Sequence, residues 1–234
     1  MIQDLINQAS ISAQVSEKYP TYVAHLLVVD GIRNEPTNEF SDNYLAKAEK
    51  FASDLLASVA IEELPEVRIW REAFRSFGVK PSDGRSSFEA LLGRSCKGLP
   101  RIDFLTDVYN VLSVIHLLPI GGENFDNYQG APRLEIATGD ETFDTTENGE
   151  AVIVNPTPGE VIWRDDLGVT CRRWNWRQCV RTRLSPETET ALFIFDGLGE
   201  DAAAKIASCA RDLAEVISAK WPNAMLNSVY LPSN

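Results

Sequence analysis

Histidine and cysteine are both scarce in this chain, which has two histidines and four cysteines among its 234 residues. The cysteines, Cys96, Cys171, Cys179 and Cys209, show none of the paired spacings that zinc sites use. The sequence also has no glycine-rich phosphate loop and no local signature of a serine hydrolase. We therefore expect no metal, no cofactor and no conventional catalytic triad.

Long apolar runs are missing as well. No stretch reaches about 18 apolar residues, so we expect no membrane span. The opening segment, MIQDLINQ, has no basic stretch followed by an apolar one, so we expect no signal peptide and a cytoplasmic location. Hydrophobic residues still make up 44% of the chain, which is enough for a packed core. We interpret residues 1–234 as a single domain, with 1–64 as an α/β lead-in.

Positive charge is in short supply, since the formal net charge is −12. Such a chain repels nucleic acid at long range, which argues against non-specific binding to it. Basic residues nevertheless concentrate in two segments, 65–119 and 171–183. The second segment, CRRWNWRQCVRTR, carries five arginines and no acid. We predict that the two segments form the walls of one local anion-binding site.

Periodicity predicts helices in the first half and strands in the second. Apolar residues recur at helical spacing over 41–56, 65–78, 86–98, 104–118 and 201–220. Short apolar segments between turn residues predict strands over 22–32, 134–136, 151–154, 161–164, 169–175, 191–195 and, at a sheet edge, 223–231. Helices followed by an antiparallel sheet indicate an α+β fold.

The predicted strand over 169–175 has the richest chemistry. Strand alternation, continued to Arg177, places Arg173, Asn175 and Arg177 on one face and Trp174 and Trp176 on the other. The first row is suited to clamping phosphates and the second to stacking bases. The alternative is that the tryptophans lie in the core and the arginines pair with acidic residues.

Four further basic residues, Arg75, Lys80, Arg85 and Arg101, lie at predicted helix ends or in loops. Loop positions favour direct contact with a ligand phosphate. Cations also stabilise the C-terminal end of a helix without any ligand, so both interpretations stay open.

Three polar residues are our candidates for catalysis. Asn110 and Ser113 share a helix face at i and i+3, and Asn175 lies on the basic strand. Ester hydrolysis requires donors for the developing oxyanion and a positioned water, and it does not require a nucleophilic side chain. These three residues would supply the donors.

The segment after the 104–118 helix adds backbone and acidic candidates. The amides of Gly121 and Gly122 could form an anion-binding nest. Glu123 and Asp165 could bind an amino group or position water. Asp165 is equally well explained as part of a hairpin turn that continues to Gly168.

Six ordered blocks also resemble a known family. They are FRSFGVKP (74–81), RSS (85–87), GLPRI (98–102), DVYN (107–110), LLPIGG (117–122) and RWNWRQ (173–178). In this order they resemble freestanding proteins related to the tRNA-binding editing domain, modules B3 and B4, of the phenylalanyl-tRNA synthetase β subunit, over residues 70–198. The resemblance implies a three-layer α+β fold with an unusual β-sandwich.

The resemblance also implies a function. In the full synthetase this domain hydrolyses tyrosine that is wrongly attached to the phenylalanine tRNA. Here a glycine-rich strand segment of the synthetase is replaced by residues 173–178, which end with Gln178 and would narrow the pocket. We include Gln178 among the ligand-binding candidates, and we expect no complete ligase.

We accordingly predict a tRNA-interacting protein that contacts the 3′ acceptor end and acts as an aminoacyl-tRNA deacylase on mischarged tRNA(Phe). Two alternatives remain open. One is a non-catalytic binding module for an amino acid, a nucleotide or a tRNA end. The other is a binder or hydrolase of a small amino-acid-derived metabolite, which the acidity of the chain favours.

Overall fold

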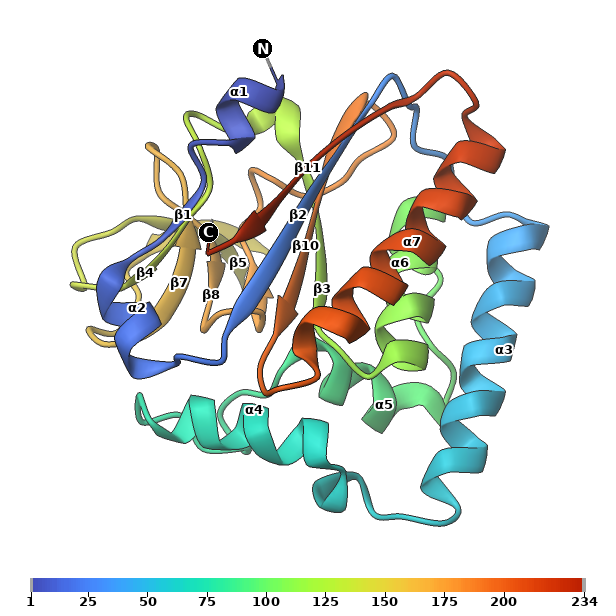
Figure 1. Ribbon diagram of the computed structural model, residues 1–234, viewed down its shortest axis with the longest axis horizontal. Helices are drawn as coiled ribbons and strands as arrows, with labels where there is room; N and C mark the ends of the chain where they lie inside the picture. Colours follow the sequence, from blue (N-terminus) through green and yellow to red (C-terminus); the bar gives the residue numbers. More distant parts are fainter. Residues whose placement is uncertain (1, 233–234) are drawn as a thin grey trace.

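A four-stranded antiparallel sheet lies at the centre of the computed structural model, which describes residues 2–232 (Figure 1). Its strands, in spatial order, are β11 (Met225–Leu231), β2 (Val23–Asp30), β10 (Thr190–Gly197) and β3 (Ile120–Asn124). The two inner strands, β2 and β10, pair along eight residues each and are almost entirely apolar. Continuous apolar character is expected of strands that are buried on both faces.

The two faces of this central sheet support two separate cores. On one face, Val29 and Phe193 pack against the helices α6 (Phe104–His116) and α7 (Ala202–Lys220). On the other face, Val28 packs into the core that the second sheet also lines. A longer helix, α3 (Glu39–Leu56), packs against α6. Sheet, sheet and helices thus form three layers, which confirms the α+β fold class.

The second sheet has five strands in the order β1 (Ser10–Ile11), β4 (Arg133–Ile136), β7 (Val161–Arg164), β8 (Val169–Arg172) and β9 (Arg177–Gln178). A separate hairpin is formed by β5 (Phe143–Glu147) and β6 (Glu150–Val154). Among the strands that the structure describes, only β1 pairs in parallel, and it comes from the N-terminal part of the chain. The second sheet packs against one face of the central sheet, and this pair of sheets corresponds to the β-sandwich that the resemblance implies.

The first 64 residues contribute more than a lead-in. The short helices α1 (Ile2–Ile6) and α2 (Ala13–Lys18) flank β1, and β2 is an inner strand of the central sheet. The strand β11, near the other end of the chain, pairs with β2 at the sheet edge. The central sheet therefore needs segments on both sides of the region 70–198.

The helices α4 (Pro65–Arg75) and α5 (Ser87–Ser95) lie below the two sheets in the view of Figure 1. Two single turns complete the helical segments of the described residues: η1 (Ile61–Glu63), just before α4, and η2 (Phe125–Asn127), directly after β3. Proline opens α4 at its first position, as its fixed φ angle favours. Ser86 and Glu89 have the spacing of a capping box at the start of α5, but the Ser86 side chain makes no cap hydrogen bond and Glu89 pairs with Arg71 at 2.7 Å.

The strand predicted over 169–175 ends early, at Arg172. Arg173 and Trp174 have φ angles of 48° and 66°, in the left-handed region, so the chain turns there and returns as β9. The predicted alternation of side chains beyond Arg172 is therefore wrong. Trp174 turns into the core and is fully buried, whereas Trp176 is only half-buried. Packing of the large indole offsets the backbone strain of a left-handed non-glycine residue.

Truncation of Trp174 should therefore destabilise the fold strongly. We expect Trp174→Ala to lower the free energy of unfolding by about 3–5 kcal/mol, because a fully buried aromatic side chain leaves a cavity. Trp176→Ala, at the half-buried position two residues later, is the control and should cost only about 1 kcal/mol. Equilibrium urea unfolding of both variants measures this, and equal losses would contradict the assigned role of Trp174.

Candidate functional site

A cavity of about 260 Å³ lies between the helices α5 and α6 and the two sheets. We call it the cavity. It brings together many of the residues predicted from the two basic segments: Asn110, Gly121, Glu123, Trp174, Asn175, Trp176, Arg177 and Gln178. Parts of 65–119 and 171–183 thus do line one site. Its interior, however, is acidic and aromatic, with only Arg177 as a cation among the described lining residues.

Glu123 is the first of two buried carboxyl groups in the cavity. It comes from β3 and is 2% exposed. Its Oε2 accepts hydrogen bonds from the Tyr128 hydroxyl at 2.6 Å and the Thr182 hydroxyl at 2.8 Å. Its Oε1 has no hydrogen-bond partner among residues 2–232. Burial raises the pKa of Glu123 to about 7, although the two hydrogen bonds lower it in part.

Asp196 is the second buried carboxyl group, and it was not among the residues predicted from the sequence. It lies near the end of β10 and accepts hydrogen bonds from the Tyr22 hydroxyl, the Trp163 indole and, at 3.5 Å, the Asn175 amide. Burial raises its pKa to about 7. The available signal was a single acid within an otherwise apolar buried strand, which is a costly position for a structural residue.

Two amides have unused hydrogen-bonding capacity at the cavity. Asn110, on α6, is buried, and its side chain has no hydrogen-bond partner within the described chain. Asn175 donates to Asp196, but no other described residue donates to its buried Oδ1. The hydroxyl of Ser87, at the start of α5, also has no hydrogen-bond partner among residues 2–232. Buried polar groups are normally paired, so these three indicate a place for a polar ligand or water.

Aromatic rings form much of the cavity wall. Tyr109, Trp163, Trp174 and Trp176 all line it. At the exposed end, the guanidinium groups of Arg173 and Arg177 lie 4.2 and 5.6 Å from the centroid of the Trp176 ring. These contacts hold the Trp176 ring in place by cation–π attraction.

Gln178 also lines the cavity, but its side-chain N–H groups already donate hydrogen bonds within the protein. Its Nε2 donates to the carbonyl oxygens of Gly122 and Thr182, both at 3.0 Å. The bond to Gly122 connects β9 to β3, and the bond to Thr182 holds the segment after β9. Together they fix the position of Gln178 in the cavity wall.

An open groove of about 490 Å³ adjoins the cavity. We call it the outer groove. Trp176 and Ala90 line both, and the exposed Arg85 and Arg94 line the groove alone. Arg94 was not among the predicted residues, because it falls late in a helix where a cation needs no further explanation. The groove therefore offers two cations beside a partly exposed indole, and its lining also includes one acid, Asp83.

The paired strand β3 contradicts the predicted nest. Gly121 and Gly122 pair with Ile194 and Phe193 of β10, so they do not form a concave anion-binding turn. Gly122 is required for packing instead, because a Cβ atom there would lie 2.5 Å from the Tyr109 ring. The nest was expected because two successive glycines leave the backbone amides accessible, whereas here pairing with β10 makes the segment a strand.

Ser113 does not reach the cavity. It is fully buried, and its hydroxyl donates to the carbonyl oxygen of Leu118 at 2.7 Å, which closes the end of α6. Asp165 also lies elsewhere, in the hairpin turn, where it pairs with Arg181 at 2.8 Å. Burial works against its ionisation, but Arg181 and backbone N–H donors prevail and lower its pKa. The turn interpretation of Asp165 fits this geometry.

Several predicted phosphate ligands are placed away from the site or neutralised. Arg101 pairs with Asp42 at 2.8 Å and with Glu49, both on α3. Arg75 and Lys80 are exposed but line neither the cavity nor the outer groove. Arg173 pairs at 3.3 Å with the buried Glu160, which also binds Arg172. The predicted row of free guanidinium groups is therefore wrong.

Comparisons with known proteins agree with this architecture. A family model described as the B3/4 domain matches residues 69–214, more than half of the chain. The chain belongs to the B3/4 domain family. This span includes the lining residues of the cavity, from Ser87 to Asp196. The resemblance seen in the sequence is thus confirmed.

One solved structure is similar over a wider span. It is an N-terminal fragment of the phenylalanyl-tRNA synthetase β-subunit from Pyrococcus horikoshii, with a TM-score of 0.49 and 10% sequence identity. The match covers 96% of this chain and 54% of that chain, so this B3/4 protein spans about half the length of the fragment. No curated protein matches the sequence significantly. None of the helices within residues 2–232 is long and apolar enough for a membrane crossing.

The raised pKa of Glu123 has a consequence for stability. Between its ordinary value of 4.5 and about 7, the folded chain keeps a proton that the unfolded chain has released. Stability therefore falls as pH rises through this window, by a contribution on the order of 3 kcal/mol. Glu123→Gln should flatten this fall, as measured by urea unfolding at pH 5 and pH 8.

The control for this comparison is Glu150→Gln, at an exposed position of β6. It should change the free energy of unfolding by the same small amount at both pH values. A Glu123→Gln profile as steep as that of the unchanged protein would contradict the buried, protonated state of this carboxyl group.

Proposed function

We propose that this B3/4 protein binds the 3′ aminoacyl end of a tRNA and hydrolyses the ester when the amino acid is mismatched. The proposal rests on one observation: a cavity with unused hydrogen-bonding groups adjoins a groove lined by cations, and Trp176 belongs to both. An aminoacyl-tRNA end has a small polar part, the amino acid, and a phosphate-bearing part, the terminal nucleotide. The cavity suits the first part and the outer groove suits the second. The resemblance to an editing domain supports the same substrate.

The cavity would hold the amino acid. Its ammonium group would donate to Asn175 Oδ1, the buried acceptor that lacks a partner. Asn110 would donate to the ester carbonyl oxygen, where negative charge develops in the transition state. Glu123, with its free Oε1 and a pKa of about 7, would take a proton from the water as the water oxygen bonds to the ester carbon. It would return that proton to the ribose oxygen when the ester C–O bond breaks, so that the free amino acid and the intact tRNA hydroxyl leave. Asp196 would fix the orientation of Asn175 through their hydrogen bond.

The outer groove would hold the terminal nucleotide. Arg85 and Arg94 would neutralise its phosphates, and Trp176 would stack on its base. Other arginines of the two basic segments are already paired with acids, as Arg173 is with Glu160. Contact would therefore be limited to the last few nucleotides, which is compatible with an acidic protein.

Hydrolysis is tested with purified protein and tyrosyl-tRNA(Phe), together with other mischarged tRNAs. We expect deacylation above background, reduced about 100-fold by Glu123→Gln because the general base is lost. Glu150→Gln, an exposed acid-to-amide change, should leave the rate unchanged. The released amino acid is measured at pH 7, where Glu123 is half ionised. No turnover on any aminoacyl-tRNA would exclude the enzymatic function.

The outer groove is tested by binding at several salt concentrations. The Arg85→Ala/Arg94→Ala double variant should weaken binding of aminoacyl-tRNA and flatten its salt dependence, by about 0.7 in log–log slope for each lost phosphate contact on a single strand. Arg75→Ala, which removes an exposed arginine outside the groove, is the matched control. An unchanged slope in the double variant would show that the tRNA end does not use this groove.

A second candidate function is non-catalytic binding of a free amino acid in the cavity. The neutralisation of Arg172 and Arg173 by Glu160 favours it, because few cations remain for tRNA. Thermal shift measurements with phenylalanine, tyrosine and adenosine compounds separate the two functions. Stabilisation by an amino acid with no detectable affinity for tRNA at low salt would favour this candidate.

A further inference from the structure

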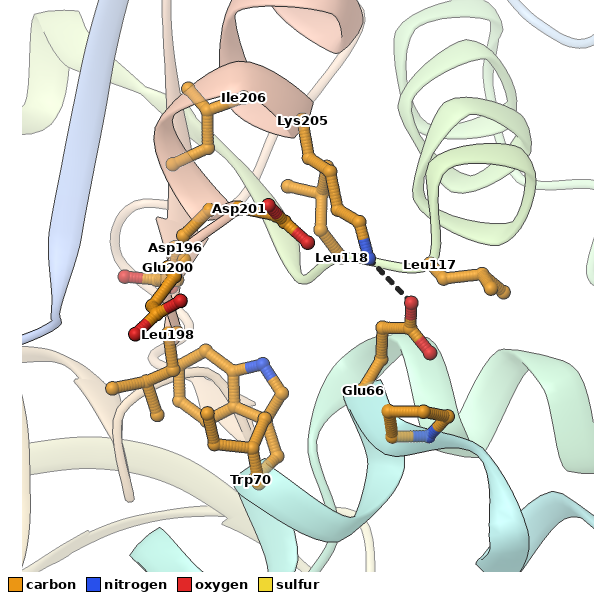
Figure 2. A pocket seen from close by; sticks show the side chains of 15 residues that line it. Glu66, Trp70, Leu117, Leu118, Asp196, Leu198, Glu200, Asp201, Lys205 and Ile206 are labelled. Carbon is orange, nitrogen blue, oxygen red and sulfur yellow. Dashed lines mark hydrogen bonds and ion pairs between the residues drawn. The ribbon is translucent and has the colours of Figure 1, made fainter.

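A second hollow, of about 300 Å³, lies between the start of α4, the end of α6 and the loop from β10 to α7 (Figure 2). We call it the α4–α7 hollow. Among the described residues, Asp196 alone also lines the cavity. Ile69, Leu118 and Ile206 give the hollow an apolar lining. It is therefore a separate place with its own chemistry.

Opposite charges meet at this hollow. Lys205 of α7 forms an ion pair with Glu66 of α4 across it, and their side chains are 39% and 21% exposed. Figure 2 also shows the carboxylate of Asp201 pointing toward the Lys205 ammonium. The side chain of Asp201 has no hydrogen-bond or ion-pair partner in the part of the chain that the structure describes. Asp196 and Glu200 line the hollow as well, so its described lining presents one cation among four acidic side chains.

Trp70 supplies an independent sign of a ligand. The residue is 3% exposed, and its indole N–H has no hydrogen-bond partner within residues 2–232. Figure 2 shows the ring nitrogen on the edge of the indole that faces the hollow. A buried indole normally donates its N–H, so an acceptor from a ligand or water belongs at this position.

We propose that the α4–α7 hollow binds a small zwitterion, an α-amino acid with an aliphatic side chain. Its carboxylate accepts from the Lys205 ammonium and the Trp70 N–H, and its ammonium group contacts Glu66 and Asp201. Its side chain packs on the apolar lining. A simple anion would meet more acidic side chains than Lys205 alone compensates, and a simple cation would leave the indole N–H without an acceptor. This site is independent of the function proposed for the cavity.

The test is methyl NMR of the full chain titrated with L-leucine. Ile206 and Leu118 report on the hollow, and Ile194 and Leu91 report on the cavity. We expect saturable shifts at the hollow reporters. N-acetyl-leucine and leucine methyl ester, which each lack one of the two charges, should bind at least roughly tenfold more weakly. Shifts at the cavity reporters alone, equal binding of either analogue, or no shifts would overturn the proposal.

Variants decide whether the named groups carry the binding. Lys205→Met should weaken leucine binding at least roughly tenfold, and Trp70→Phe, which keeps an aromatic ring but removes the N–H, should weaken it several-fold. Lys50→Met is the matched control, because Lys50 pairs with Asp54 at 2.7 Å on α3, away from the hollow. Binding should survive in Lys50→Met and also in Glu123→Gln. Unchanged binding in Lys205→Met, with native circular dichroism, would overturn the assignment.

Discussion

The burial of one side chain, Trp174, determines the geometry of the candidate site. Its ring lies among Tyr19, Tyr22 and Trp70, with ring centroids 4.6, 4.9 and 5.2 Å away. This packing holds two successive residues in left-handed conformations, which the chain would otherwise avoid. Because the turn is fixed there, the next residue, Asn175, reaches the buried Asp196. The cavity wall is thus a product of core packing rather than of a regular strand.

Local charge pairing explains how a basic segment exists in so acidic a protein. Glu160 is 1% exposed and binds two guanidinium groups, from Arg172 and Arg173, so it compensates the densest positive charge of the chain. Burial opposes ionisation of this carboxyl group, but the two arginines prevail and lower its pKa. The cations left over, such as Arg85 and Arg94, lie on the outside. Electrostatic attraction at the site is therefore short-ranged and confined to the outer groove.

Periodicity predicted elements that bury one continuous face, and it failed where tertiary partners decide the conformation. The strand β7 and the helix α7 appear almost as expected, because their apolar patterns are unambiguous. In contrast, β3 begins Ile-Gly-Gly, and nothing local distinguishes it from a loop until β10 pairs with it. Asn110 and Glu123 were identified from residue type, whereas Asp196 was missed because a lone acid in an apolar strand has no motif. The left-handed turn after Arg172 contains no glycine, so sequence rules did not reveal it.

The position of β2 in the middle of the central sheet has a consequence for biosynthesis. Its partner β10 follows much later, and the hydrogen bond from Thr190 to Asp30 joins residues 160 positions apart. During translation, β2 is synthesised long before either neighbouring strand, so it stays unpaired until most of the chain has been made. An apolar segment in that situation is prone to aggregation until its partners emerge. The nascent chain is thus expected to need shielding, for instance by a chaperone, until β10 has left the ribosome.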